Sequence, residues 1–103
     1  VILIIDHIEA AEPVEISWPL HTLSEPKRAE GECVAVSRKN INMKVCPVSG
    51  DLRFERITDK FEVDLNEGVP KEFWVTMPEQ YHIMWKTDKK AVHDICVEFR
   101  IDI

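Results

Sequence analysis

The chain has 103 residues, of which 45% are hydrophobic and 31% are charged, proportions typical of one soluble globular domain. Its net charge of −6 and its 13 scattered basic residues argue against nucleic-acid binding, which depends on Lys and Arg that neutralise phosphates. No apolar run reaches the roughly 20 residues that span a bilayer, so we expect no membrane partner either.

The first 23 residues have the pattern of two strands joined by a short connection. Val1–Ile5 is continuously apolar, which predicts a strand covered on both faces. Because native proteins seldom begin inside a strand, we expect the chain to be a fragment of a larger protein. Ala10–Pro13 is predicted as the connection. In Val14–Leu23 every second residue is apolar, which predicts a half-buried antiparallel strand with Trp18 at the centre of the core and Pro19 at an edge or bulge.

Further strands are predicted between turn signals along the rest of the chain. Lys39-Asn40 and Ser49-Gly50-Asp51 are typical of tight turns. The clearest alternation runs from Ala91 to Ile103, with Phe99 inward and Arg100 outward. The other predicted strands are Glu32–Arg38, Ile41–Val45, a strand from Leu52, Phe61–Leu65, Phe73–Met77 and Tyr81–Trp85. These patterns predict an all-β fold, a two-layer antiparallel β-sandwich, formed by residues 1–103 as one domain.

The three cysteines, Cys33, Cys46 and Cys96, each lie among residues typical of strands. An odd number cannot pair completely, and small disulfide scaffolds contain cysteine at a higher density. We therefore expect three buried free thiols. One bridge with one thiol left over is the alternative, and the cysteine content alone does not decide the cellular compartment.

The search for catalytic or metal-binding patterns centres on four histidines, His7, His21, His82 and His93. None has metal-ligand spacing to another histidine or to a cysteine, so the sequence predicts no metal site. His93 shares the apolar face of the last strand and is predicted to be a core histidine. His21 alternates outward and is a candidate for contact with a substrate. No Ser lies in a G-x-S-x-G turn and three glycines cannot build a phosphate-binding loop, so we predict no catalytic residue and no cofactor.

The tryptophans differ in their predicted orientation. Trp18 and Trp85 lie on apolar faces and are predicted to be in the core. Trp74 opposes Phe73 and Val75 and is predicted to point outward. An outward Trp on a β-sandwich is typical of carbohydrate-binding modules, which makes Trp74 a candidate substrate-binding residue. The favoured interpretation is that a second sheet or a neighbouring domain covers it, because exposed aromatic patches more often mark interfaces.

A resemblance to a known family extends over most of the chain. Residues 4–23 read IIDHIEAAEPVEISWPLHTL and resemble the sandwich region of heparinase II/III-like polysaccharide lyases, where an apolar run ending in Asp precedes a Trp-x-Leu-His strand. Thr58–Val63 and Gln80–Ile83 resemble later parts of that region. The resemblance implies a secreted or periplasmic bacterial enzyme with an α/α-toroid followed by β-sandwich domains. Such enzymes cleave uronate-containing polysaccharides by β-elimination, with Tyr and His as base and acid, often beside a structural metal.

The chain departs from this family at the catalytic residues. The helical domain with its catalytic Tyr is absent, no His is followed by Asn, and Tyr81, the only Tyr, has a strand context typical of packing. No catalytic role or metal ligand is therefore carried over to this chain. We expect an accessory C-terminal β-sandwich domain whose partner is the catalytic domain of the parent lyase. The alternatives are a carbohydrate-binding module with a polysaccharide partner, and an Ig-like interaction domain unrelated to lyases.

Overall fold

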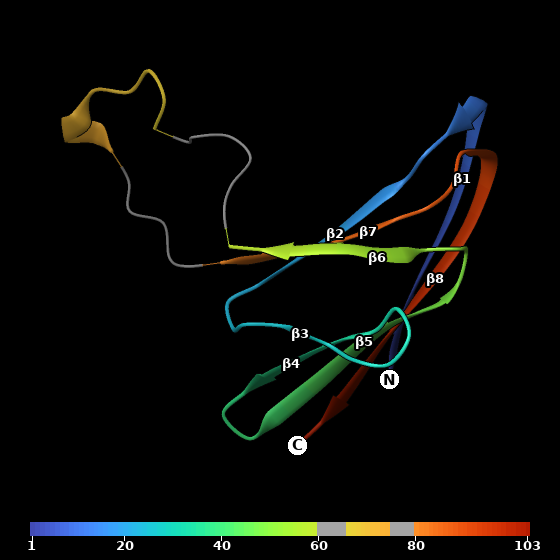
Figure 1. The fold of residues 1–103 in the computed structure, drawn as a ribbon, viewed down its shortest axis with the longest axis horizontal. Helices are drawn as coiled ribbons and strands as arrows, with labels where there is room; N and C mark the ends of the chain where they lie inside the picture. The colour runs from blue at the N-terminus through green and yellow to red at the C-terminus, as the bar shows by residue number, and fades with distance from the viewer. Residues whose placement is uncertain (60–65, 75–79) are drawn as a thin grey trace.

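The computed structural model describes residues 1–59, 66–74 and 80–103, and its strands form two antiparallel sheets that pack face to face (Figure 1). This arrangement confirms the predicted all-β, two-layer antiparallel β-sandwich. The elements in chain order are β1 (Ile2–Val14), β2 (Ser17–Thr22), β3 (Lys27–Arg28), β4 (Val34–Arg38), β5 (Ile41–Ser49), β6 (Arg53–Thr58), the 3-10 helix η1 (Lys71–Phe73), β7 (Tyr81–Lys86) and β8 (Lys90–Asp102).

The two sheets differ in size. Sheet A has the strand order β1-β8-β5-β4-β3, and sheet B has the order β2-β7-β6. Strand β8 is an interior strand of sheet A, because it pairs with β1 on one side and with β5 on the other. Within the described part of the chain, no helix is long and apolar enough to cross a membrane.

The core lies between the facing sides of the two sheets. The alternation predicted for the last strand is confirmed, since Ile95 and Val97 of β8 are each 1% exposed. Trp85 of β7 is also 1% exposed and is the large aromatic residue at the centre of the core. Trp18, predicted to hold that place, lies on the edge strand β2, is half-buried, and packs edge-on against Trp85 with 5.8 Å between ring centroids. The buried apolar residues are Val34, Val45, Leu52, Ile83, Trp85, Ile95 and Val97.

Strand β1 departs from two predictions. Val1–Ile5 was expected to be covered on both faces, but β1 is an edge strand of sheet A and these five side chains are 38–80% exposed. The predicted connection Ala10–Pro13 lies inside β1, which continues to Val14 through an irregularity in its register with β8 after Glu9. An edge strand tolerates Pro13, because its outward side needs no backbone N–H donor.

Local turn and edge signals are confirmed. Pro19 lies on β2, an edge strand of sheet B, and Lys39-Asn40 connects the paired strands β4 and β5. Gly50, in the turn after β5, has φ +91° and comes so close to β8 that a Cβ atom would lie 2.5 Å from the carbonyl oxygen of Asp94. Both the backbone angle and this contact require glycine there.

Two predicted strands fall wholly or partly outside the described residues. The strand expected over Phe61–Leu65 lies outside them. For the strand expected over Phe73–Met77, residues 75–79 also lie outside. Phe73 itself ends the 3-10 helix η1, so the strand prediction is wrong for this residue.

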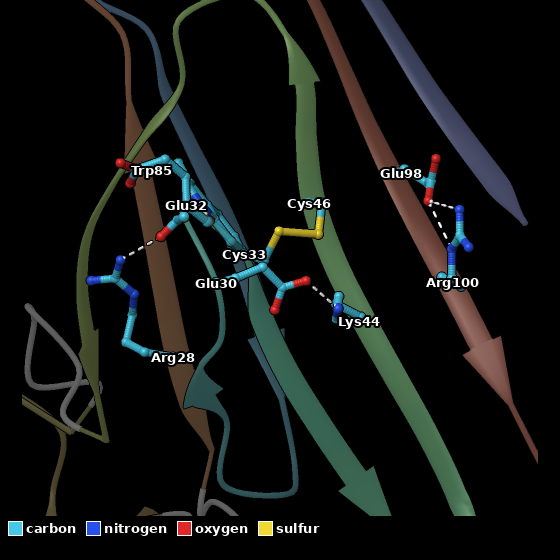
Figure 2. The surroundings of a disulfide bond; sticks show 10 residues. Arg28, Glu30, Glu32, Cys33, Lys44, Cys46, Trp85, Glu98 and Arg100 are labelled. Carbon is cyan, nitrogen blue, oxygen red and sulfur yellow. Dashed lines mark hydrogen bonds and ion pairs between the residues drawn. A yellow bond between two sulfur atoms is a disulfide. The ribbon is translucent and has the colours of Figure 1, made fainter.

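A disulfide joins Cys33 and Cys46 (Figure 2), while Cys96 is a half-buried free thiol. The expectation of three free thiols is therefore wrong for the first two cysteines. The cause is the strand register: Val34 pairs with Val45, so the flanking residues Cys33 and Cys46 come opposite each other, with 4.3 Å between their Cα atoms. Sequence spacing contains no information about this register.

The alternation of β8 can be tested with two adjacent substitutions. Phe99 faces sheet B, with its ring centroid 6.3 Å from that of Trp18, but it is only half-buried. We expect Phe99→Ala to lower the free energy of unfolding by about 2–3 kcal/mol, below the range for fully buried Phe. Arg100 faces solvent and donates to Glu98, so Arg100→Ala should change it by less than about 0.5 kcal/mol. Similar losses in urea unfolding would contradict the assignment of the two faces.

The disulfide can be tested by counting thiols. In denaturant without reductant, a thiol reagent should titrate one thiol per chain, because two of the three cysteines are joined by a disulfide. After reduction all three cysteines should react. Three reactive thiols before reduction would show that Cys33 and Cys46 are not bonded.

Candidate functional site

Sheet B covers only part of sheet A, because its strands are shorter. β1 and β8 have 13 residues each, whereas β2, β6 and β7 have 6 each. At a rise of about 3.3 Å per residue these lengths are about 43 Å and about 20 Å. Figure 1 shows the β4–β5 hairpin and both chain ends extending beyond the strands of sheet B. The inner face of sheet A is therefore open at this end, in that no described strand of sheet B covers it.

The strand register identifies the side chains on this open face. Val36, Met43 and Ile101 lie opposite one another across β4, β5 and β8. In the next row toward the core, Phe99 lies opposite Ile2 of β1. Exposure rises along the face: Val45 is fully buried, whereas Ile101 is 47% exposed and Ile2 is 55% exposed. We call this surface the apolar extension; it consists of Ile2, Val36, Ile41, Met43, Phe99 and Ile101.

The apolar extension is hollowed near the β4–β5 hairpin. A pocket of about 430 Å³ is lined by Val36, Arg38, Lys39, Ile41 and Met43. Arg38 and Lys39 place two cations at its rim, and neither makes an ion pair with another described residue. The pocket therefore combines an apolar floor with a basic rim, on a chain whose net charge is −6.

The free edge of β1 adjoins the apolar extension. No described strand pairs with this edge, and no charged residue occurs within Val1–Ile5. Natural edge strands are usually protected from pairing by charged side chains, proline or a cover. Ile2–Ile5 of β1 have none of these within the described residues, which is typical of an edge that contacts another protein surface.

Trp74, a predicted binding residue, is exposed but lies elsewhere. Its side chain is 52% exposed, and its indole N–H donates a 2.8 Å hydrogen bond to the carbonyl oxygen of Val69. The adjacent Phe73 is also exposed, at 67%. Figure 1 places η1, which precedes Trp74, away from the chain ends and the β4–β5 hairpin. Trp74 is thus separate from the apolar extension.

His21, the other predicted binding residue, lies beside a second histidine. It is opposite His82 in the pairing of β2 with β7, and the ring centroids are 4.3 Å apart. The sequence showed only that both residues lie on alternating strands, because a sequence pattern does not reveal a pairing between residues separated by 60 others. Among the described residues, no group of three or more His, Cys, Asp or Glu side chains is arranged to hold a metal ion.

His93 is confirmed as a core histidine. It is 1% exposed, and its Nε2 lies 2.8 Å from the carbonyl oxygen of Val14. Because a carbonyl oxygen can only accept, Nε2 carries the proton and donates it. The side chain thus fastens the end of β1 to β8 from within the core.

An exposed ionic cluster crosses β1 and β8. The Nδ1 atom of His7 lies 2.5 Å from Asp94 Oδ1, and its Nε2 lies 3.1 Å from Glu9 Oε1. Hydrogen bonding to Asp94, and then to Glu9, raises the pKa of His7 above its ordinary value. The protonated imidazole therefore fastens the edge strand β1 to β8 on the outer face.

Comparisons of the chain with known protein families, with curated proteins and with solved structures found no match. The apolar extension is the most developed of the candidate surfaces, since it combines exposed apolar side chains, a pocket and an unprotected strand edge.

The His7 cluster predicts a pH-dependent contribution to stability. Because the folded-state pKa is raised, the contribution is fully present below the unfolded pKa of roughly 6.5 and is lost as the pH rises through the folded-state pKa. The difference in unfolding midpoint between wild type and His7→Gln should therefore be larger at about pH 5.5 than at about pH 9. An NMR titration should also show that Asp94→Asn lowers the pKa of His7. A pKa unaffected by Asp94→Asn would contradict the contact.

Proposed function

We propose that this chain is a non-catalytic β-sandwich domain that binds a neighbouring protein domain through the apolar extension. The observation that supports this proposal is the open inner face of sheet A, where Ile2, Ile41 and Ile101 are each 46–55% exposed. Contiguous apolar patches on monomeric proteins commonly mark interaction surfaces. Because this patch lies on paired strands rather than on a loop, it is presented rigidly and loses little entropy on binding.

The resemblance of the chain supplies the identity of the partner in this proposal. The partner is the α/α-toroid catalytic domain of a heparinase II/III-like polysaccharide lyase, in a parent protein that is secreted or periplasmic. The Cys33–Cys46 disulfide supports an oxidising compartment, since disulfides persist there and are rare in the cytosol.

The physical basis of this binding is removal of apolar area from water. Full burial of an aliphatic or aromatic side chain of this size is worth about 1.5–3 kcal/mol. Phe99 and Ile101 lie at the centre of the surface, where residues contribute most to affinity. Arg38 and Lys39 lie at its rim, where charges act mainly on orientation and association rate.

Sugar binding through Trp74 is the second candidate function. The indole of Trp74 is 52% exposed and offers a stacking surface for a pyranose. The small number of polar groups described at this surface favours protein docking over sugar binding, because specific sugar sites orient hydroxyls with placed polar groups.

The docking proposal is tested with a matched pair of substitutions on β8. Ile101 on the inner face is 47% exposed, and Val92 on the outer face is 49% exposed. Both therefore tolerate a charge without loss of the core. Ile101→Asp should weaken binding to the separately expressed toroid domain of the parent protein by about tenfold or more, and Val92→Asp by less than about twofold.

Calorimetry measures both affinities, and retention on heparan sulfate, chondroitin sulfate and alginate columns tests the second candidate. Equal effects of Ile101→Asp and Val92→Asp would contradict docking through the apolar extension. Retention of the wild type that disappears in Trp74→Ala would make the chain a carbohydrate-binding module.

A further inference from the structure

The three cysteines of the chain lie on three neighbouring strands of sheet A. Cys33 immediately precedes β4, Cys46 lies on β5 and Cys96 on β8, and the strand order is β8-β5-β4. Cys46 is opposite Glu98 in the register between β5 and β8. Cys96 is two residues from Glu98 on the same strand, so it faces the same side of the sheet as Cys46.

Cys96 and Cys46 are therefore diagonal neighbours on the outer face of sheet A. Diagonal residues in an antiparallel pair lie about 7–8 Å apart, and their Cβ atoms are somewhat closer. Each sulfur extends one bond beyond its Cβ, and because the Cys46 sulfur is held toward Cys33, it is the side chain of Cys96 that leans across toward β5 to bring the sulfurs into contact. Cys96 is half-buried rather than sealed in the core, which leaves its side chain this freedom.

The strand order also sets the direction of approach. Figure 2 shows the disulfide bridging from β5 toward the segment before β4, with β8 on the opposite side of β5. A thiolate attacks a disulfide along the axis of the S–S bond, and the far sulfur leaves. Cys96 lies on the side of Cys46 that is opposite Cys33, as this geometry requires.

We propose that these three residues form an intramolecular thiol–disulfide exchange centre. Cys96 loses its proton and its thiolate attacks Sγ of Cys46. The Cys96–Cys46 bond forms while the Cys46–Cys33 bond breaks, and the electron pair goes to Cys33, which takes up a proton. One disulfide and one thiol are present before and after the exchange, so no oxidant or reductant is consumed.

The backbone of β5 beside Cys46 is suited to this rearrangement. A bulge interrupts its register with β8 between Pro47 and Ser49, and Val48 within the bulge is 58% exposed. A disulfide needs Cα atoms within about 7 Å of each other, so the diagonal pair must move closer. A bulge is where a strand shifts with the smallest loss of ladder hydrogen bonds.

The exchange changes what holds the segment before β4. In the Cys33–Cys46 form this segment is covalently fixed to β5, and Glu30 of the same segment forms an ion pair with Lys44 (Figure 2). In the Cys46–Cys96 form Cys33 becomes a thiol at the surface pocket of about 380 Å³ that it lines with Glu30 and Leu52. The exchange therefore changes which cysteine is the free thiol, from Cys96 on β8 to Cys33 at this pocket.

Trapping free thiols in the folded wild type tests the proposal. The protein is incubated with iodoacetamide at about pH 8, where thiolate is present, and the labelled cysteines are identified by peptide mass mapping without reduction. We expect labelled Cys96 in some chains and labelled Cys33, with a Cys46–Cys96 disulfide, in more than about one chain in ten. Label on Cys96 alone after prolonged incubation would overturn the proposal.

Two variants with equal numbers of thiols provide the matched comparison. Cys33→Ser leaves the diagonal pair Cys46 and Cys96, which should form a disulfide in air under native conditions. Cys46→Ser leaves Cys33 and Cys96 on opposite sides of β5, and both should stay reduced. Equal oxidation of the two variants would show that unfolded chains, and not the sheet geometry, bring the thiols together.

Discussion

The buried indole of Trp85 is the interaction on which the two-sheet arrangement depends. Its ring lies on β7 of sheet B at 1% exposure, and its N–H donates a 2.7 Å hydrogen bond to the carbonyl oxygen of Glu32, just before β4 of sheet A. An unpaired N–H at this depth would destabilise the fold by about 1–3 kcal/mol. The carboxylate of Glu32 also accepts a hydrogen bond from the backbone N–H of Phe54 on β6. One short segment of the chain thus sets the position of one sheet on the other.

The same arrangement divides sheet A into a closed part and an open part. Near Trp85 both layers are present, and Val34 and Val45 are completely buried. Further along β4, β5 and β8 no described strand forms a second layer, while the alternation of apolar side chains continues unchanged to Ile101. A partner domain that packs on this face would supply the second layer and bury the exposed apolar side chains. This is why we propose the apolar extension as the docking surface.

The amino-acid sequence alone predicted the features that depend on local geometry. The alternation in β8, the edge position of Pro19 and the turn at Lys39-Asn40 each follow from backbone and side-chain properties within a few residues. The exposure of Val1–Ile5 was not predictable, because an apolar strand has the same pattern whether a neighbour covers it or not. For the same reason, the sequence pattern did not predict that the apolar extension is exposed.

Pairings between distant segments were likewise outside the reach of sequence patterns. The Cys33–Cys46 bridge depends on the register of β4 with β5, and the contact of His21 with His82 depends on the pairing of β2 with β7. Residue types and spacings in the sequence predict neither this register nor this pairing. The predicted outward orientation of Trp74 agrees with its observed exposure. That prediction assumed a strand beginning at Phe73, whereas Phe73 is the last residue of the 3-10 helix η1.

The position of β8 between β1 and β5 has a consequence for how the chain reaches its native state. Among the described strands β1 is synthesised before all the others, but its pairing partner β8 is synthesised after all the others. The apolar residues of β1 therefore leave the ribosome before β8 exists, and they stay unpaired until nearly the whole domain has been synthesised. Pairing over such a sequence separation is slow, and a strand whose first residues, Ile2–Ile5, are all apolar is prone to join other chains while it is unpaired. The productive yield of this domain in the cell thus depends on how well β1 is shielded before β8 arrives.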